Sequence, residues 1–187
     1  MQSTKHIILI TGTPSAGKTT LITKVIEALK AHGYKTGGMT TKEKRQGELR
    51  VGFQIQDLET RRQGWLAHVN QPNGPRIGKY RVNLDDLDSI GASAIQEAIK
   101  TADVIIIDEI GPMELYSQAF KQAVQQAIDS AKPVLATIHY RATDAFVKNI
   151  KMYPDAELYE VTTESRNTLH NLIIEKITKT LQGNLKC

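Results

Sequence analysis

The sequence predicts an α/β fold in which helices cover both faces of a mainly parallel β-sheet. Continuous apolar runs, such as VIII at residues 104–107, are typical of strands that are buried on both faces. In the second half of the chain these runs alternate with segments of helical periodicity, which favours right-handed crossovers and a three-layer arrangement. The 187 residues are enough to bury one substantial core, so we expect residues 1–187 to form a single domain.

The N-terminal part is expected to form a strand, a loop and a helix. Residues 5–11, KHIILIT, make an apolar, β-branched run of strand length. A segment rich in Gly, Pro and Ser follows, and after it residues 18–33 carry apolar side chains at helical spacing. Gly33 stands where the helix is expected to end.

Residues 35–81 are expected to form a β-hairpin insertion and a loop within this domain. In ELRVGFQIQDL, residues 48–58, apolar side chains alternate with polar ones, which is typical of a half-buried antiparallel strand. RQGE and ETRRQG are predicted turns, and VNQPNGPRIGKY, residues 69–80, is rich in Pro, Gly and Asn and is predicted to be loop. The segment has ten Lys or Arg against four Asp or Glu. Such a basic surface suits a polyanion such as a nucleotide, but its few aromatic side chains argue against nucleic acid as the partner.

The second half of the chain returns to strict alternation of helices and strands. Helices are expected within 84–100, from about 114 to 129, around 143–151 and near 165–181. The strands between them are expected at DVIIIDEI (103–110), PVLATI (133–138) and AELYEV (156–161).

Composition and cysteine usage indicate a cytoplasmic protein. The single cysteine, Cys187, excludes a disulfide within the chain. We see no apolar stretch of bilayer length and no signal-peptide pattern at the N-terminus, so no membrane partner is expected. The expected oligomeric state is a monomer.

Residues 12–20, GTPSAGKTT, match the phosphate-binding loop pattern GxxxxGK(S/T) between the first predicted strand and helix. Glycines let the backbone amides turn toward a phosphate, and the helix adds its positive N-terminus. Lys18 is expected to reach the β- and γ-phosphates and Thr19 to bind Mg²⁺. The expected nucleotide contacts are Gly12, Thr13, Pro14, Ser15, Ala16, Gly17, Lys18, Thr19 and Thr20.

Carboxylates lie at the carboxyl end of the predicted strand at 103–110 and shortly after it. Asp108 is expected to hold Mg²⁺, because ligands of open α/β sheets lie at the carboxyl ends of strands. Glu109 is placed to orient or deprotonate an attacking water. Glu114 either points back at the γ-phosphate or favours a helix N-terminus through the macrodipole.

Several further polar residues are weaker candidates. Thr137 lies at the end of the predicted strand at 133–138, and His139 and Arg141 follow it. An arginine there would stabilise charge on a transferring phosphoryl group. Arg166 precedes the last helix and is a candidate contact for the base or ribose, the alternative being a surface charge. Lys79 and Tyr80 are candidate lid contacts.

These motifs resemble those of the THEP1-type nucleoside-triphosphatases, small P-loop NTPases of archaea and bacteria with a vertebrate member. The resemblance covers nearly the whole chain, and DEIGPMEL is its most specific stretch. It implies a three-layer α/β/α P-loop NTPase (RecA-like) fold and slow Mg²⁺-dependent hydrolysis of ATP, GTP and other triphosphates to diphosphate and phosphate. Roles for Glu114, Arg141 and Arg166 are also implied, since they fall on recurring positions. The chain departs from the family pattern at Met39, where an aromatic is common, and at Arg81, where glycine is common.

Two other functions stay open from the sequence alone. A small-molecule or nucleotide kinase would need an acceptor pocket, which the basic hairpin segment could form. A GTP-binding accessory protein, resembling the molybdopterin-guanine-dinucleotide assembly factor, would share GKTTL but would leave DEIGPMEL without a role. The sequence has no NKxD-like guanine signature, so it does not rank the bases.

Overall fold

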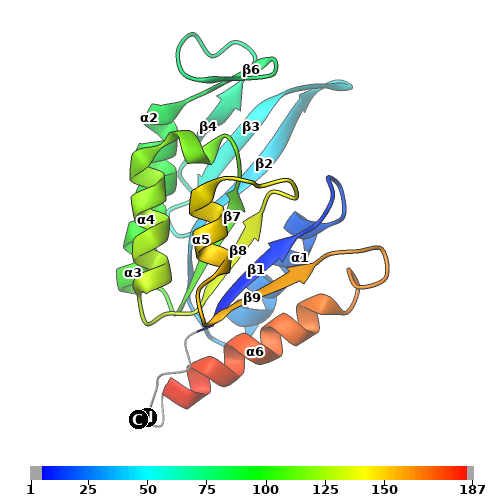
Figure 1. The fold of residues 1–187 in the computed structure, drawn as a ribbon, viewed down its shortest axis with the longest axis vertical. Helices are drawn as coiled ribbons and strands as arrows, with labels where there is room; N and C mark the ends of the chain where they lie inside the picture. The colour runs from blue at the N-terminus through cyan, green and yellow to red at the C-terminus, as the bar shows by residue number, and fades with distance from the viewer. Residues whose placement is uncertain (1–5, 185–187) are drawn as a thin grey trace.

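The computed structural model describes residues 6–184, in which a nine-stranded sheet has helices on both faces (Figure 1). The strand order is β5-β6-β4-β3-β2-β7-β8-β1-β9. The strands are β1 (Ile7–Thr11), β2 (Thr36–Gln46), β3 (Leu49–Asp57), β4 (Gln63–His68), β5 (Arg76–Ile77), β6 (Tyr80–Val82), β7 (Val104–Ile110), β8 (Val134–Ile138) and β9 (Ala156–Glu160). The helices are α1 (Lys18–Ala31), α2 (Leu84–Asp86), the π-helical η1 (Leu87–Ala92), α3 (Ser93–Thr101), the 3₁₀ turn η2 (Glu114–Tyr116), α4 (Gln118–Asp129), α5 (Ala145–Lys151) and α6 (Leu169–Asn184).

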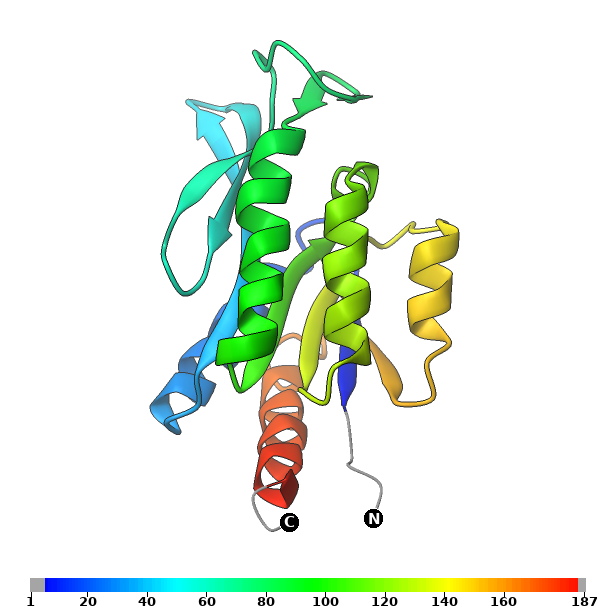
Figure 2. The same ribbon diagram turned by 90° about the vertical axis from the view of Figure 1, so that its left-hand side faces the viewer.

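The predicted three-layer fold with a parallel core is confirmed. Strands β2, β7, β8, β1 and β9 pair in parallel, and β8 lies between β1 and β7. Helices α3, α4 and α5 cover one face of these strands, as Figure 2 shows, and α1 and α6 cover the other. Because both faces are covered, the strands carry the continuous apolar runs seen in the sequence.

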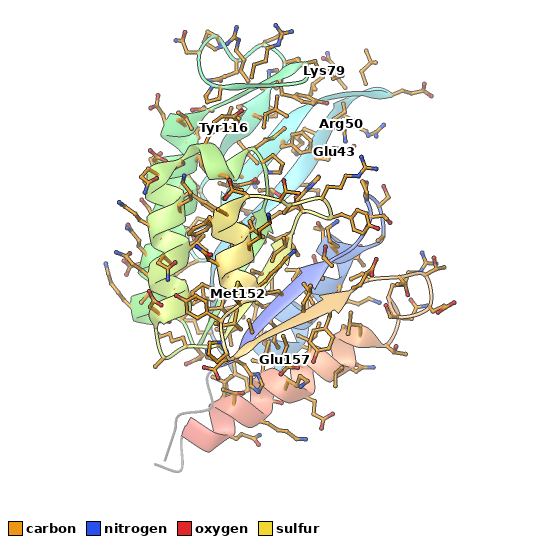
Figure 3. The ribbon with its side chains drawn as sticks, in the orientation of Figure 1. Glu43, Arg50, Lys79, Tyr116, Met152 and Glu157 are labelled. Carbon is orange, nitrogen blue, oxygen red and sulfur yellow. The ribbon has the colours of Figure 1, made fainter. Side chains whose placement is uncertain are left out.

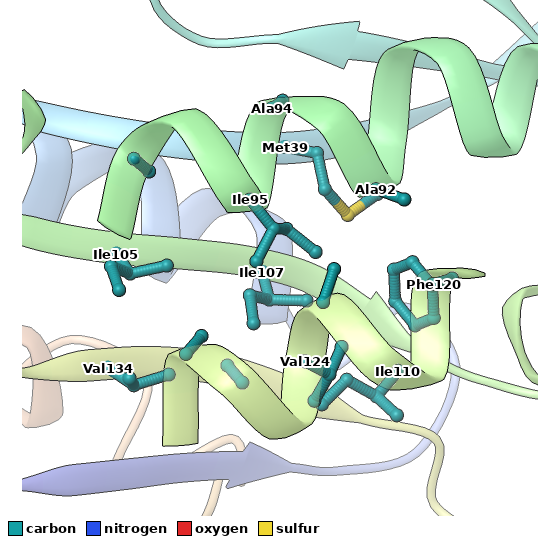
Figure 4. Packing of buried hydrophobic residues seen from close by; sticks show 14 of the residues in the cluster. Met39, Ala92, Ala94, Ile95, Ile105, Ile107, Ile110, Phe120, Val124 and Val134 are labelled. Atoms are coloured by element: carbon teal, nitrogen blue, oxygen red, sulfur yellow. The ribbon is translucent and has the colours of Figure 1, made fainter. Parts of the chain in front are cut away.

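Each face of the sheet has its own apolar core, because successive side chains of a strand point in opposite directions. Ile7 and Leu9 of β1 pack on the face of α3 and α4, whereas Ile8 and Ile10 pack toward α1 and α6. Figure 4 shows the first core, where Phe120 lies among the aliphatic side chains of α3, α4 and β7. These two cores hold the carboxyl ends of the parallel strands at one common edge.

The hairpin segment begins inside the core rather than outside it. Residues 36–40 of β2 pair in parallel with β7, and residues 39–46 pair antiparallel with β3, so one strand serves both parts. The segment at 69–80, predicted to be loop, differs in containing the short strand β5 and the first residue of β6, and these two strands pair with each other around a turn at Gly78. The hairpin therefore extends the same sheet past its parallel part.

Three of the helices differ from the sequence prediction, each for a local reason. The segment at 84–101 contains the π-helical stretch η1 between α2 and α3. The helix predicted from about residue 114 is the short turn η2 followed by α4, whose start is capped by Ser117, the acceptor of a 2.9 Å bond from Phe120 N. The last helix begins at Leu169 instead of near 165, because Ser165 and Thr162 bond each other in a turn. Among residues 6–184 we find no helix with the length and apolar character needed to cross a membrane.

Candidate active site

The phosphate-binding loop joins β1 to α1 at the carboxyl edge of the parallel strands. Gly17 precedes the helix with φ +105°, a left-handed conformation that strains other residues. The first intrahelical bond runs from Leu21 N to Gly17 O over 2.9 Å, which leaves the amides of residues 18–20 free of helical carbonyl partners. Lys18 Nζ lies over the loop, 2.9 Å from Gly12 O. The loop thus combines unpaired amides, a helix N-terminus and an ammonium group.

Asp108 is a buried carboxylate at the end of β7. Thr137 at the end of β8 donates a 2.5 Å bond to Asp108 Oδ1, and Oδ2 is buried with no hydrogen-bond partner within residues 6–184. Burial raises the pKa of Asp108 to about 6, although Thr137, Thr19 and the charge of Lys18 act to lower it. The arrangement leaves one carboxylate oxygen available beside the phosphate loop.

Thr19 and Asp108 suit a small hard cation. A hydroxyl and a carboxylate oxygen are ligands that Mg²⁺ accepts, and Mg²⁺ usually takes one or two protein oxygens and completes its shell with phosphate and water. The unpaired Asp108 Oδ2 is the observation that fits such an ion, because a buried lone oxygen is otherwise costly. Across the described chain no group of three or more His, Cys, Asp or Glu residues is arranged to hold a metal ion.

Glu109 and Glu114 converge over Gly111. A Cβ atom at Gly111 would lie 2.8 Å from Glu109 Oε1 and 3.0 Å from Glu114 Oε2, so the backbone here leaves room for both carboxyl groups. The η2 turn brings Glu114 back, and its Oε2 accepts a 3.1 Å bond from Gly111 N. Burial raises the pKa of Glu109, with Lys18 opposing the shift. Burial and the neighbouring charge of Glu109 raise the pKa of Glu114 to about 8.

These groups face one cleft of about 640 Å³. The cleft extends from the phosphate loop to the β2–β3 hairpin, and two thirds of its lining residues come from elements far from the loop in sequence. Its lining consists of Pro14, Ser15, Gly17, Lys18, Thr19, Thr20, Thr41, Glu43, Arg50, Phe53, Leu66, Ile77, Asp108, Glu109, Pro112, Met113, Glu114 and His139.

Comparison with known proteins identifies the family. A sequence model of a family described as NTPase matches residues 7–174. The chain belongs to this NTPase family. The nucleoside-triphosphatase THEP1 of Thermofilum pendens is 49% identical over 162 residues, which cover 86% of this chain and 89% of that protein. THEP1 of Methanocaldococcus jannaschii is 45% identical, over 91% of this chain and 96% of its own.

Two solved structures are similar to this NTPase. The crystal structure of THEP1 from Aquifex aeolicus superposes with a TM-score of 0.82 at 34% identity, covering 91% of this chain and 98% of that one. The solution structure of a human cancer-related nucleoside triphosphatase gives a TM-score of 0.78 at 35% identity, covering 94% and 98%. The expected family, fold and enzyme class, a nucleoside-triphosphatase, are thereby confirmed.

Not every candidate residue from the sequence lines the cleft of this NTPase. Arg141 and Arg166 are exposed and lie outside the lining, in the loops after β8 and β9, so their roles stay predictions. His139 does line it, and burial with the nearby charges of Lys18 and Arg141 lowers its pKa. Thr137 bonds Asp108 and is absent from the lining. Among the loop residues, Gly12, Thr13 and Ala16 also lie outside the lining.

The hairpin wall is the part of the site that sequence reasoning missed. Arg50, Phe53 and Ile77 line the cleft, whereas the candidate lid residue Tyr80 is buried and binds Arg50, and Lys79 lies over the Tyr80 ring. The alternation of apolar residues in β3 was a usable signal for Phe53. It does not say which face of the hairpin turns toward the phosphate loop.

Proposed function

We propose that this protein hydrolyses ATP, GTP and other nucleoside triphosphates to the diphosphate and phosphate, with Mg²⁺ and little preference for the base. The observation that carries the proposal is the convergence of three groups in one cleft: Lys18 in a phosphate loop, the unpaired oxygen of Asp108 and the carboxyl group of Glu109. Phosphoryl transfer needs little more than positioned charge and a positioned nucleophile.

In the proposed complex the loop amides, the α1 N-terminus and Lys18 bind the β- and γ-phosphates. Thr19 and Asp108 would hold Mg²⁺, which supplies charge neutralisation on the β- and γ-oxygens when it is bound. Thr137 orients Asp108 by donating to Oδ1, which leaves Oδ2 as the oxygen that would hold the ion. These contacts all involve the phosphates or the ion, so they do not distinguish one base from another.

Glu109 is the proposed general base. It takes a proton from water as the water oxygen bonds to the γ-phosphorus and the bond to the bridging oxygen of the diphosphate breaks. Glu114 is the weaker candidate, because burial and the charge of Glu109 raise its pKa to about 8, and a protonated carboxyl group is a poor base. We assign Glu114 to holding Glu109 in position over Gly111.

Low base specificity and action as a monomer are parts of the same proposal. Residues of one chain can make all the proposed phosphate and metal contacts, and the candidate base contact, Arg166, is exposed in the β9–α6 loop. The sequence offers no guanine-specific NKxD pattern.

The test is phosphate release from ATP, GTP, CTP and UTP with Mg²⁺ and no added acceptor. We expect slow release from all four, and none from Lys18→Ala, which also controls for contaminating phosphatases. Glu109→Gln should keep nucleotide bound while turnover falls about 100-fold, the scale of a lost general base. Glu114→Gln should reduce turnover less. Absence of release from protein that binds nucleotide would overturn the proposal, and full activity of Glu109→Gln would move the base to Glu114.

A further inference from the structure

The cleft has two ends with different chemistry. The inner end carries Lys18, Thr19, Asp108 and Glu109 at the carboxyl ends of β1 and β7. The outer end, which we call the hairpin compartment, is formed mostly by the β2–β6 segment. It consists of Glu43, Arg50, Phe53, Leu66, Ile77 and Met113.

The nucleotide does not account for the hairpin compartment. In the function proposed above, on which this orientation rests, the phosphates extend from the loop after β1 toward Asp108 after β7, two strand spacings or about 10 Å away. The γ-phosphate end then faces β2 and β3, which lie on the far side of β7. The nucleoside end faces the opposite edge of the sheet, toward β9. The hairpin compartment therefore lies beyond the γ-phosphate.

The wall of the compartment is apolar, whereas a γ-phosphate is not. Leu66 is buried, and Phe53, Ile77 and Met113 are half-buried where they face the cleft. An apolar wall in a concave site, with a few polar groups converging on it, is the usual design for an organic ligand. Phosphate oxygens gain nothing from contact with these side chains.

The guanidinium group of Arg50 is fixed by hydrogen bonds at the hairpin compartment. Arg50 Nε donates to Tyr80 Oη and Nη1 donates to Glu43 Oε2, each over 2.9 Å, and the guanidinium lies 5.4 Å from the centre of the Phe53 ring. Arg45 also binds Glu43, over 2.6 Å, so two arginines share one carboxylate. Figure 3 shows Glu43 and Arg50 together on the hairpin, with Lys79 near them. Arg50 thus places a guanidinium beside the apolar wall, while Arg45, which lies outside the lining, shares the charge of Glu43.

We propose that the hairpin compartment binds a second ligand, an organic anion with an apolar body, at the same time as the nucleotide. Its body packs on Phe53 and Ile77, and its anionic group binds Arg50. It lies on the side of the γ-phosphate where the attacking group must approach, next to Glu109. An occupant there limits access of water to the γ-phosphate without displacing the nucleotide.

The other face of the hairpin supplies a matched control. A second groove, of about 520 Å³, lies between α1 and strands β2–β4 and is lined by polar side chains that include Lys42, Gln54 and Gln56. Gln54 follows Phe53 in β3 but lines this second groove, so substitutions at the two positions change opposite sides of one strand. A ligand of the hairpin compartment should respond to changes at Phe53 and not at Gln54.

The experiment is calorimetric titration of the full chain with 2-naphthoate and with its neutral analogue 2-naphthalenemethanol. We expect saturable binding of 2-naphthoate to one site, with an affinity that stays within about twofold when a non-hydrolysable ATP analogue and Mg²⁺ are present. Phe53→Ala should weaken binding at least about tenfold, as expected for a lost apolar contact. Gln54→Ala should leave it unchanged. Arg50→Gln should weaken 2-naphthoate about tenfold, the scale of a hydrogen bond to a charged group, and leave the neutral analogue unaffected.

A kinetic measurement adds an independent readout. In phosphate release, 2-naphthoate should lower kcat and leave KM for ATP unchanged. Phe53→Leu, which keeps an apolar side chain, and a thermal unfolding curve for each variant distinguish lost binding from lost folding. Lys18→Ala should abolish hydrolysis but retain binding of 2-naphthoate, so failure of the proposed hydrolysis would leave this test intact.

Four results would overturn the second-ligand site. They are absence of saturable binding, competition between 2-naphthoate and the ATP analogue, unchanged affinity in folded Phe53→Ala, and loss of affinity in Gln54→Ala. The last of these would assign the anion to the second groove instead.

Discussion

Replacing Gly111 by alanine should separate catalysis from stability. The added Cβ would lie 2.8 Å from Glu109 Oε1 and 3.0 Å from Glu114 Oε2, whereas ordinary contacts begin at 3.4 Å. The two carboxyl groups must therefore retreat by about 0.6 and 0.4 Å. Both atoms are the far ends of flexible side chains, so the fold can accommodate the methyl group at little cost.

The expected result for Gly111→Ala is a fall in kcat of about 10- to 100-fold, because a misplacement of about 1 Å in a catalytic group costs about 100-fold. KM and nucleotide affinity should change little, since the phosphate loop is not touched. The assay is steady-state phosphate release at saturating ATP, alongside equilibrium binding of a non-hydrolysable analogue and thermal unfolding.

A second glycine substitution provides the control for Gly111→Ala. Gly183 lies in α6, and a Cβ there meets nothing within 4 Å. Gly183→Ala should leave kcat unchanged and keep or slightly raise stability, as alanine generally does in a helix. A Gly111→Ala protein that turns over within twofold of the wild type would refute the reasoning that these carboxyl positions matter for catalysis.

Three further substitutions test other parts of the structure. Thr137→Val removes the hydroxyl that holds Asp108 Oδ1, so turnover should fall about tenfold and more Mg²⁺ should be needed for the half-maximal rate. Thr137→Ser should restore both. An unchanged Mg²⁺ titration in Thr137→Val would contradict the positioning role. Ile107→Ala empties part of the core shown in Figure 4 and should lower the free energy of unfolding by about 2–5 kcal/mol in denaturant titrations. The Tyr159 hydroxyl and a lysine neighbour hold the pKa of Glu157 below its usual 4.5, so this carboxylate stabilises the fold above that pH and loses its effect as pH falls through the lowered pKa. The stability difference between wild type and Glu157→Gln should therefore shrink in acid, and a constant difference down to pH 2 would contradict the assignment.

The fold and the inner half of the site could be predicted because their signals are local. The GTPSAGKTT loop needs a strand before it and a helix after it, and both were legible from periodicity. Asp108 and Glu109 could be placed because a buried strand ends at a known edge of a parallel sheet. In each case the local sequence alone determines the secondary structure and the place of the residue in the sheet.

The outer half of the site could not be predicted because it depends on contacts between distant segments. Alternation in β3 places Phe53 and Gln54 on opposite faces of the hairpin. Which face turns toward the phosphate loop depends on how β2 pairs with β7 at one end and with β3 at the other. The position of Glu114 was equally open, since the η2 turn brings it over Gly111 and the spacing in sequence alone does not. The roles of Arg141 and Arg166 stay predictions for the same reason, because loop conformation decides what an exposed arginine reaches.

Strand β2 gives the hairpin a mechanical connection to the catalytic edge. Thr40 pairs with Asp108 of β7 on one side and with Gln56 of β3 on the other. No loop or turn interrupts β2 between Thr40 and the cleft-lining Glu43, and its register shift with β3 comes later, between Lys44 and Arg45. We therefore expect a tilt of the hairpin to displace the backbone of β2 beside Asp108 as well.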